Sequence, residues 1–163
     1  MLLTTKQTKP HKTTTNSFKD ATALLKADHK LVASLFADYE STNSNNKKKQ
    51  LVEKICKELS IHAQVEEEIF YPAVQKALKD HELVPEAIVE HNTLKDLIAA
   101  VKGTEPNGDM YDAKIKVMSE YVKHHVKEEE SEMFPDARNT QLDLVELGAK
   151  MTERKGQLSS EYV

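Results

Sequence analysis

Apolar residues recur every three or four positions along most of the chain, which is the spacing that places them on one face of an α-helix. Only four glycines and five prolines interrupt the 163 residues. The pattern predicts an all-α protein. The expected helices cover about residues 17–40, 47–72, 83–103 and 109–135, and a shorter fifth helix covers about 142–151.

Local signals mark the ends of these helices. Ser17-Phe18-Lys19-Asp20 has the form of a capping box in which aspartate takes the usual place of glutamate. Pro72 removes one backbone hydrogen bond, so the second helix is expected to kink or pause there. Gly103 suits a helix C-terminus. Four amphipathic helices with short connections predict an antiparallel, up-down-up-down four-helix bundle with a short fifth C-terminal helix.

The length of the chain fits one domain. Residues 1–17 contain six threonines, three lysines and no acid, and they are expected to form a disordered tail. Residues 18–154 are expected to form the bundle with its short C-terminal helix, and residues 155–163 to fray.

Charge and cysteine content exclude several classes of function. Lys and Arg total 23 against 27 Asp and Glu, and the two signs are mixed along the chain, so nucleic acid is not an expected partner. No apolar run approaches the roughly 18–20 residues that cross a bilayer, so no membrane association is expected. Cys56 is the single cysteine, which excludes an internal disulfide and favours a cytoplasmic protein with a buried structural thiol.

The motif His-x-x-x-Glu occurs twice, at 62–66 and 125–129, and carries the strongest chemical signal. In both copies the histidine stands ten residues before a proline that follows an aromatic residue. His29 lies 33 residues before the first copy, and His91 lies 34 before the second. The chain therefore reads as two helical hairpins, each offering one histidine and then one His-x-x-x-Glu.

This arrangement suits metal binding. Residues four apart on a helix share a face, so both side chains of each motif can converge on one site. Imidazole and carboxylate donors without sulfur suit iron, zinc, manganese or copper. Glu66 and Glu129 can each bridge two ions, because a carboxylate has two oxygens. The histidines would then cap the ions in pairs, His29 with His62 and His91 with His125.

A single histidine on an apolar stripe is usually a core residue with a hydrogen-bond partner. Four histidines at matched positions, with two glutamates that would otherwise be buried without partners, favour two metal ions instead. A bridging water, hydroxide or oxide would bring each ion to about five bonds. An ion that prefers six keeps an open position for a small ligand.

In this order and spacing, the sequence resembles the hemerythrin-like (HHE cation-binding) domains over roughly residues 20–151. The resemblance implies a four-helix bundle around a non-haem di-iron centre with a bridging oxo, hydroxo or water group, and zinc or manganese are alternative metals. The residues that fall on the family's ligand positions are His29, His62, Glu66, His91, His125 and Glu129.

The sequence departs from the oxygen-carrying members of that family, which have a further histidine four residues after the third-helix histidine and an aspartate five after the last. Lys95 and Glu130 occupy these positions here. The missing nitrogen argues against reversible oxygen transport. His81, before the third helix, could substitute as a fifth histidine, although a surface position is the preferred interpretation.

Other residues near the motifs are given structural interpretations. Asp28 and Glu90 could orient imidazoles, but surface charge is preferred. His124 should face outward. A solvated face is expected for Glu67, Glu68, Glu128, Glu130 and Glu132. Tyr39, Phe70 and Tyr71 could wall the metal pocket, but core positions are preferred.

The leading functional hypothesis is a di-iron protein that binds or reacts with dioxygen, hydrogen peroxide or nitric oxide in sensing or detoxification. Catalase-like peroxide dismutation is its candidate enzymatic form. The alternative is an iron or cation store, buffer or sensor without catalysis, in which the metal changes the stability of the bundle. A purely structural bundle is the third hypothesis.

Overall fold

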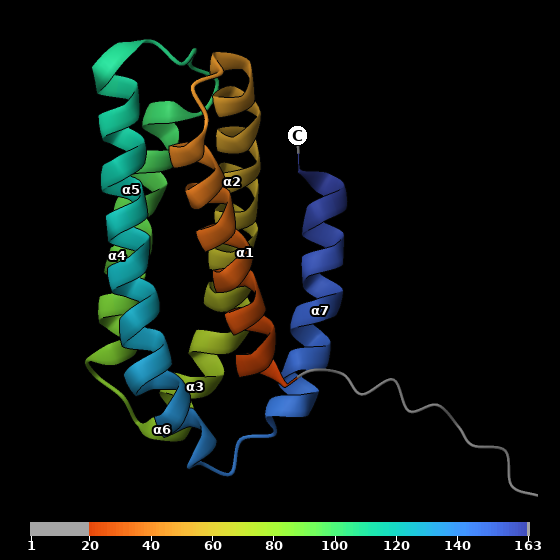
Figure 1. The fold of residues 1–163 in the computed structure, drawn as a ribbon. Helices are drawn as coiled ribbons and strands as arrows, with labels where there is room; N and C mark the ends of the chain where they lie inside the picture. The colour runs from red at the N-terminus through yellow and green to blue at the C-terminus, as the bar shows by residue number, and fades with distance from the viewer. Residues whose placement is uncertain (1–19, 163) are drawn as a thin grey trace, which may run out of the picture.

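The computed structural model describes residues 20–162, which form a helical bundle (Figure 1). Two of its four long helices are α1 (Ala21–Ser41) and α4 (Leu83–Val101). The other two are composite. One comprises α2 (Asn45–Val65), a π-helical turn η1 (Glu66–Phe70) and α3 (Tyr71–Leu78), and the other α5 (Gly108–Glu128), η2 (Glu129–Met133) and α6 (Phe134–Arg138). The predicted all-α class and antiparallel bundle are confirmed.

Side-chain caps define the first two helices. The Asp20 carboxylate accepts a hydrogen bond from the Ala23 N–H at 2.9 Å, so α1 begins at Ala21. Ser44 caps α2 in the same way. The predicted cap at Ser17 and the tail predicted for residues 1–17 lie outside the described residues. Gly103 follows α4 with a φ of 74°, a left-handed conformation that favours glycine, as predicted for a helix end.

Both composite helices contain a π-helical turn immediately before a proline. Each turn begins at the glutamate of a His-x-x-x-Glu motif, and it closes where Tyr71 N–H donates to the Glu66 carbonyl and Phe134 N–H to the Glu129 carbonyl. The wider turn accommodates Pro72 and Pro135, which lack an N–H and would crowd the preceding turn of a regular helix. The interruption expected at Pro72 is therefore a π turn that starts at Glu66.

Two apolar clusters fill the bundle, and the predicted metal residues lie between them. Along α1, Leu25 belongs to one cluster and Val32 to the other, with His29 between them. The same order recurs on α4, where His91 separates Ala87 from Leu94. The histidines are thus held by well-packed apolar layers on both sides.

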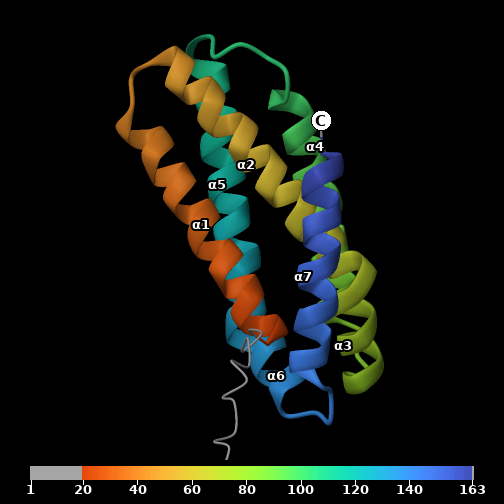
Figure 2. The ribbon, with the colours of Figure 1, turned by 90° about the vertical axis from the view of Figure 1, so that its right-hand side faces the viewer.

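The fifth helix, α7 (Leu144–Glu161), packs outside the bundle against α1, α2 and η1 (Figure 2). It is longer than the short helix that the sequence predicted, and the expectation that the chain frays from residue 155 is wrong as far as residue 161. The apolar stripe continues past that point, because Leu158 is buried and Tyr162 packs beside the same cluster. Among the helices of residues 20–162, none is long and apolar enough to cross a bilayer.

Candidate metal centre

The six residues of the predicted metal site converge inside the bundle. None of them exposes more than 8% of its surface. The rings of His29 and His62 lie with their centroids 5.0 Å apart, and those of His91 and His125 lie 4.8 Å apart. The histidines therefore meet in the two pairs that the repeat predicted.

The two glutamates lie between these pairs. Glu66 Oε1 is 2.8 Å from Nε2 of His62 and 3.5 Å from Nε2 of His91. Glu129 Oε1 is 3.8 Å from Nε2 of His29 and 2.6 Å from Nε2 of His125. Each carboxylate thus approaches one histidine of each pair, which is the position from which it can bridge two ions.

The inward-facing atoms fit a cation. Among the described residues, Nε2 of His29, Nε2 of His62 and both carboxylate oxygens of Glu66 and of Glu129 are buried without a hydrogen-bond partner, and the short contacts among them do not have hydrogen-bond geometry. Buried acceptors are costly when they are unpaired. Nitrogen and oxygen donors that converge within 4.8 Å can instead surround metal ions, in the groups His29, His62, Glu129 and Glu66, His91, His125.

The outward nitrogen of every one of these histidines faces a carboxylate. Nδ1 of His29 lies 2.9 Å from Glu130, and Nδ1 of His91 lies 3.0 Å from Glu67. Nδ1 of His62 lies 3.1 Å from Asp28, and Nδ1 of His125 contacts Glu90. Because a carboxylate can only accept, Nδ1–H donates in each case, and Nε2 is directed toward the centre, where it can bind a metal ion once it has lost its proton.

Four sequence interpretations are therefore wrong. Asp28 and Glu90 are not simple surface charges, and Glu67 and Glu130 do not belong to a solvated face. Each carboxylate orients a histidine on another helix, so neighbourhood along the chain gave no sign of the pairing. The residue before the first histidine of each hairpin contacts the second histidine of that hairpin, and the residue after the glutamate of each His-x-x-x-Glu motif contacts a histidine of the other hairpin.

The remaining polar residues lie as expected, outside the centre. His81 is exposed, and the side chain of His124 is 60% exposed. Lys95, which stands where a further family histidine would be, extends its ammonium to within 2.8 Å of Glu67. It supports the carboxylate that orients His91 and supplies no donor to the centre.

Tyr71 combines the two positions that the sequence allowed, in the core and at the wall of the centre. It is 1% exposed, and its hydroxyl lies 3.1 Å from Nε2 of His91 and 3.4 Å from Nε2 of His125. The matching residue of the second hairpin is Phe134, whose ring stacks on His29. Both residues stand directly before the proline that follows a His-x-x-x-Glu motif, and this shared position was the signal in the sequence. The π turn directs the side chain at this position toward the centre.

Burial and neighbouring charges lower the pKa of one histidine of the centre and raise the pKa values of two other histidines and of one glutamate. Burial, followed by the charge of His62, lowers the pKa of His29 to about 4. Burial and then the charge of Glu66 raise the pKa of Glu129 to about 8. Burial opposes charging of His62 and His125, but their carboxylate partners raise the pKa values to about 10 and about 11. In the metal-free protein, Glu129, His62 and His125 therefore keep their protons at neutral pH. These protons hold together the carboxylates and imidazoles that face one another.

A small enclosed space of about 20 Å³ adjoins the four histidines. Its wall is otherwise mainly apolar, with Val32, Leu59, Leu94 and Val122. About 10–15 Å³ is enough for one water-sized molecule. The space is therefore of the size of one or two water molecules.

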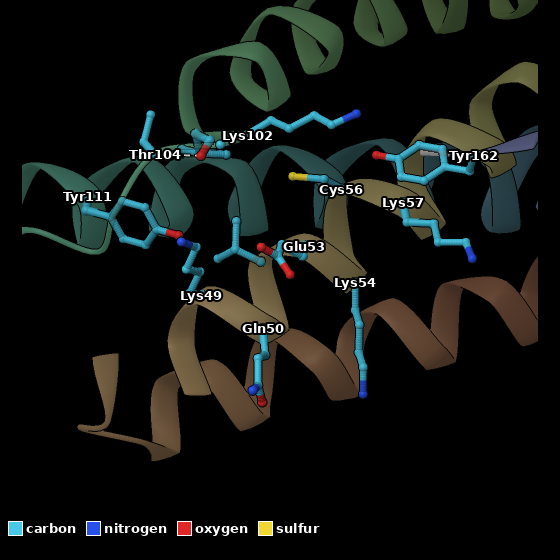
Figure 3. A pocket seen from close by; sticks show the side chains of 13 residues that line it. Lys49, Gln50, Glu53, Lys54, Cys56, Lys57, Lys102, Thr104, Tyr111 and Tyr162 are labelled. Atoms are coloured by element: carbon cyan, nitrogen blue, oxygen red, sulfur yellow. Dashed lines mark hydrogen bonds between the residues drawn. The ribbon is translucent and has the colours of Figure 1, made fainter. Parts of the chain in front are cut away.

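A separate cavity of about 530 Å³ contains none of the six residues (Figure 3). Cys56, Lys57, Lys102 and Tyr162 are among the residues that line it. Burial raises the pKa of the Cys56 thiol to about 11, so it is not a reactive thiolate. The predicted buried structural cysteine is confirmed.

Comparisons with known proteins agree with this geometry. The sequence model described as "Hemerythrin HHE cation binding domain" matches residues 20–137. The uncharacterized protein Rv2633c of Mycobacterium tuberculosis is 27% identical over 139 residues, which cover 83% of this chain and 84% of the relative. A DNA nickase of Nostoc sp. is 28% identical over 116 residues, but this chain spans only 33% of its length.

A solved structure shares the fold. The crystal structure of a hemerythrin HHE cation binding domain-containing protein from Mycobacterium kansasii, a homologue of Rv2633c, superposes with a TM-score of 0.74 at 26% identity, and the match covers 88% of this chain and 89% of that one. The family match covers most of the chain and includes all six convergent residues. This chain therefore belongs to the hemerythrin HHE cation-binding domain family and is a metal-binding, hemerythrin-like protein.

Proposed function

We propose that the protein holds two iron ions and binds or reacts with dioxygen, hydrogen peroxide or nitric oxide, in sensing or detoxification. The ions would be held by His29, His62, Glu66, His91, His125 and Glu129. Two bridging carboxylates and a pair of imidazoles for each ion support iron over zinc, because structural zinc sites are almost always closed at four bonds.

The small space beside the histidines is the observation that carries this proposal. At about 20 Å³ it suits a diatomic molecule or peroxide, and its apolar wall excludes bulk water. Two adjacent irons, when bound, would supply the electrons that such ligands exchange. The chain itself would limit access by size and keep the donors fixed through the four carboxylates that orient the imidazoles.

Tyr71 supplies a proton-bearing group at the same place. Burial, and then the charges of Glu66 and Glu129, raise the pKa of its phenol well above the usual range. The hydroxyl therefore stays protonated in the metal-free protein and can donate a hydrogen bond within the centre. Tyr71 Oη is therefore the best candidate for a proton donor at the centre.

Storage of many ions is the weaker alternative. A store needs space in which metal can accumulate, whereas the enclosed space beside the donors is about 20 Å³. A sensor or buffer with two ions remains the second functional class, because metal binding in this core would be coupled to bundle stability.

Anaerobic loading with ferrous iron tests the proposal. We expect two irons per chain, a change in the visible spectrum on exposure to oxygen or peroxide, and release of oxygen from peroxide if dismutation occurs. A Tyr71→Phe variant should keep both irons but react more slowly. Two irons with no reaction would instead support buffering or sensing, and a single zinc retained after iron loading would overturn the di-iron proposal.

A further inference from the structure

A second group of metal-binding side chains lies at the surface between α4 and α5. Nε2 of His124 is 3.4 Å from Glu90 Oε1 and 3.1 Å from Glu128 Oε1. The three donor atoms lie within 4.8 Å of one another. One imidazole nitrogen and two carboxylate oxygens from two helices form a suitable donor set for a divalent first-row metal ion.

Glu90 connects this surface group to the buried centre. Its Oε2 accepts a hydrogen bond from Nδ1 of His125, while its Oε1 faces His124. One carboxylate thus has one oxygen on each side. Because His124 faces outward and His125 inward, the two neighbouring histidines extend the same line of donors from solvent to centre.

A small space of about 10 Å³ is shared by the surface group and the centre, because Glu90 and Glu128 line it together with His125 and Glu129; its other lining residues are Leu83, Ala87 and Met133. A separate hollow of about 360 Å³ is lined by Glu86 as well as by the three surface donors, and no lysine or arginine lines it. Carboxylates therefore line both the hollow and the small space beside Glu129, which favours the approach of cations.

The four carboxylates that orient histidines mark four corners of the centre, and the surroundings of the other three differ from those of Glu90. Asp28 contacts the ammonium of Lys155, and Glu67 contacts that of Lys95. A fixed positive charge at each of these corners opposes the approach of a metal cation. Glu130, at the fourth corner, contacts His29 but belongs to no surface group of three donors among the described residues. Among these four carboxylates, Glu90 alone combines a surface imidazole, a second carboxylate and a small space shared with the centre.

We propose that Glu90, His124 and Glu128 form a loading site, which binds a divalent metal ion from solution before it passes to the centre beside His125 and Glu129. This inference rests on the proposed two-ion centre. Three donors at a partly exposed position would hold the ion more weakly than the buried cage, so the ion can move inward. No change of oxidation state is involved.

The test uses Co²⁺ as a visible probe with the full-length, metal-free protein under anaerobic conditions. Stopped-flow absorbance would measure the rate at which the centre fills, and equilibrium dialysis would count bound ions. The variant combines His124→Ala with Glu128→Gln and leaves Glu90 in place, because Glu90 also orients His125. The matched control combines His81→Ala with Glu153→Gln, an exposed histidine and an exposed glutamate on α7, the helix that packs against the other hairpin.

We expect the variant to fill about tenfold more slowly at limiting Co²⁺, because it loses the local attraction for cations. It should still reach two ions per chain, and it should lose a weaker third ion that the wild type and the control bind. Glu128→Lys should slow filling further, because it places a positive charge near Glu90, as Lys155 does at Asp28 and Lys95 at Glu67.

If the combined His124→Ala and Glu128→Gln variant and the Glu128→Lys variant both fill at the wild-type rate, the loading site is overturned while the two-ion centre stays intact. The wild type could instead bind a single weak ion that the variant with His124→Ala and Glu128→Gln does not bind. This result would overturn the two-ion centre but support a surface site. Circular dichroism of each metal-free variant would verify that the bundle is folded, so that a slower rate reports on metal access.

Discussion

The two hairpins of the bundle have the same backbone plan but different chemistry. Each supplies a histidine, a His-x-x-x-Glu motif and a π turn that begins at the glutamate. The residue before the proline is Tyr71 in the first hairpin, where its hydroxyl reaches the histidine pair of the second. The corresponding Phe134 places an apolar ring on His29. The duplication thus sets where the donors lie, and single substitutions make the two halves unequal.

The fifth helix increases this difference. α7 packs on the first hairpin, where Lys155 contacts Asp28 and Arg154 forms an ion pair with Glu68. At the position of the second hairpin that corresponds to Asp28, Glu90 contacts His124 instead of a lysine. One hairpin is therefore covered and positively capped, and the other presents carboxylates to solvent.

Removal of a bridging carboxylate should have the largest effect, and it tests whether the halves share one centre. We expect Glu66→Ala and Glu129→Ala each to weaken the binding of both ions, because each carboxylate approaches histidines of both pairs. Metal analysis after dialysis would measure the loss, with Glu132→Ala as the control. Two independent sites would instead lose only one ion in each variant and keep the other at its original affinity.

The pH dependence of the stability of the metal-free protein should show the next largest effect, because the two hairpins bind protons with different pKa values. The pKa of Glu129 is raised to about 8, so its ionisation destabilises the metal-free fold as the pH rises from about 4.5 to 8. The stabilisation from charged His62 and His125 is complete below about 6.5 and is lost as the pH rises toward about 10 and 11. Metal-free stability should therefore fall above pH 6.5.

Metal replaces these protons, so its affinity should rise by about tenfold per pH unit for each proton displaced. The difference in Tm between loaded and metal-free protein, measured by calorimetry, should consequently widen between pH 6.5 and 8.5. Glu129→Gln should flatten the pH dependence of the metal-free protein. Glu66→Gln should flatten it by a different route, because it removes the charge that raises the pKa values of Glu129 and His62, whereas the pKa of Glu66 itself is held well below its usual range by His62 despite burial. A wild-type pH dependence in either variant would contradict this account.

Exchange of the aromatic residues should have the smallest effect and tests the asymmetry directly. Tyr71→Phe removes the hydroxyl beside His91 and His125, and we expect one of the two ions to bind about tenfold more weakly, although excess metal should still fill both sites. Phe134→Tyr places a hydroxyl beside His29 instead. Calorimetric metal titration of both single variants and of the double exchange would measure the effect. If the hydroxyl has no influence on the centre, Tyr71→Phe will bind both ions as the wild type does.

Much of the fold was predictable because its signals are local. Apolar residues at helical spacing marked the bundle helices, and Gly103 marked the end of α4. The extent of α7 was missed because its last turns contain few apolar residues, and their burial depends on the cluster that receives Leu158. The π turns were anticipated only as a pause at Pro72, since the sequence does not show how the backbone accommodates a proline.

The partners of the histidines depended on distant parts of the chain. Glu67 and His91 are 24 residues apart, and His29 and Glu130 are 101 apart. Sequence spacing on one helix carries no information about which side chain approaches from another. Asp28, Glu67, Glu90 and Glu130 were for this reason interpreted as surface charges, and Tyr71 was interpreted as core.

The sequence by itself determined the helical bundle and the six positions that converge, because a helix turns residues four apart to one face and the motif is repeated. Only the tertiary structure decided which carboxylate orients each imidazole, that a phenol faces one histidine pair, and that one corner is open to cations. Those features arise where helices pack side by side, and the packing depends on contacts between residues far apart in the chain.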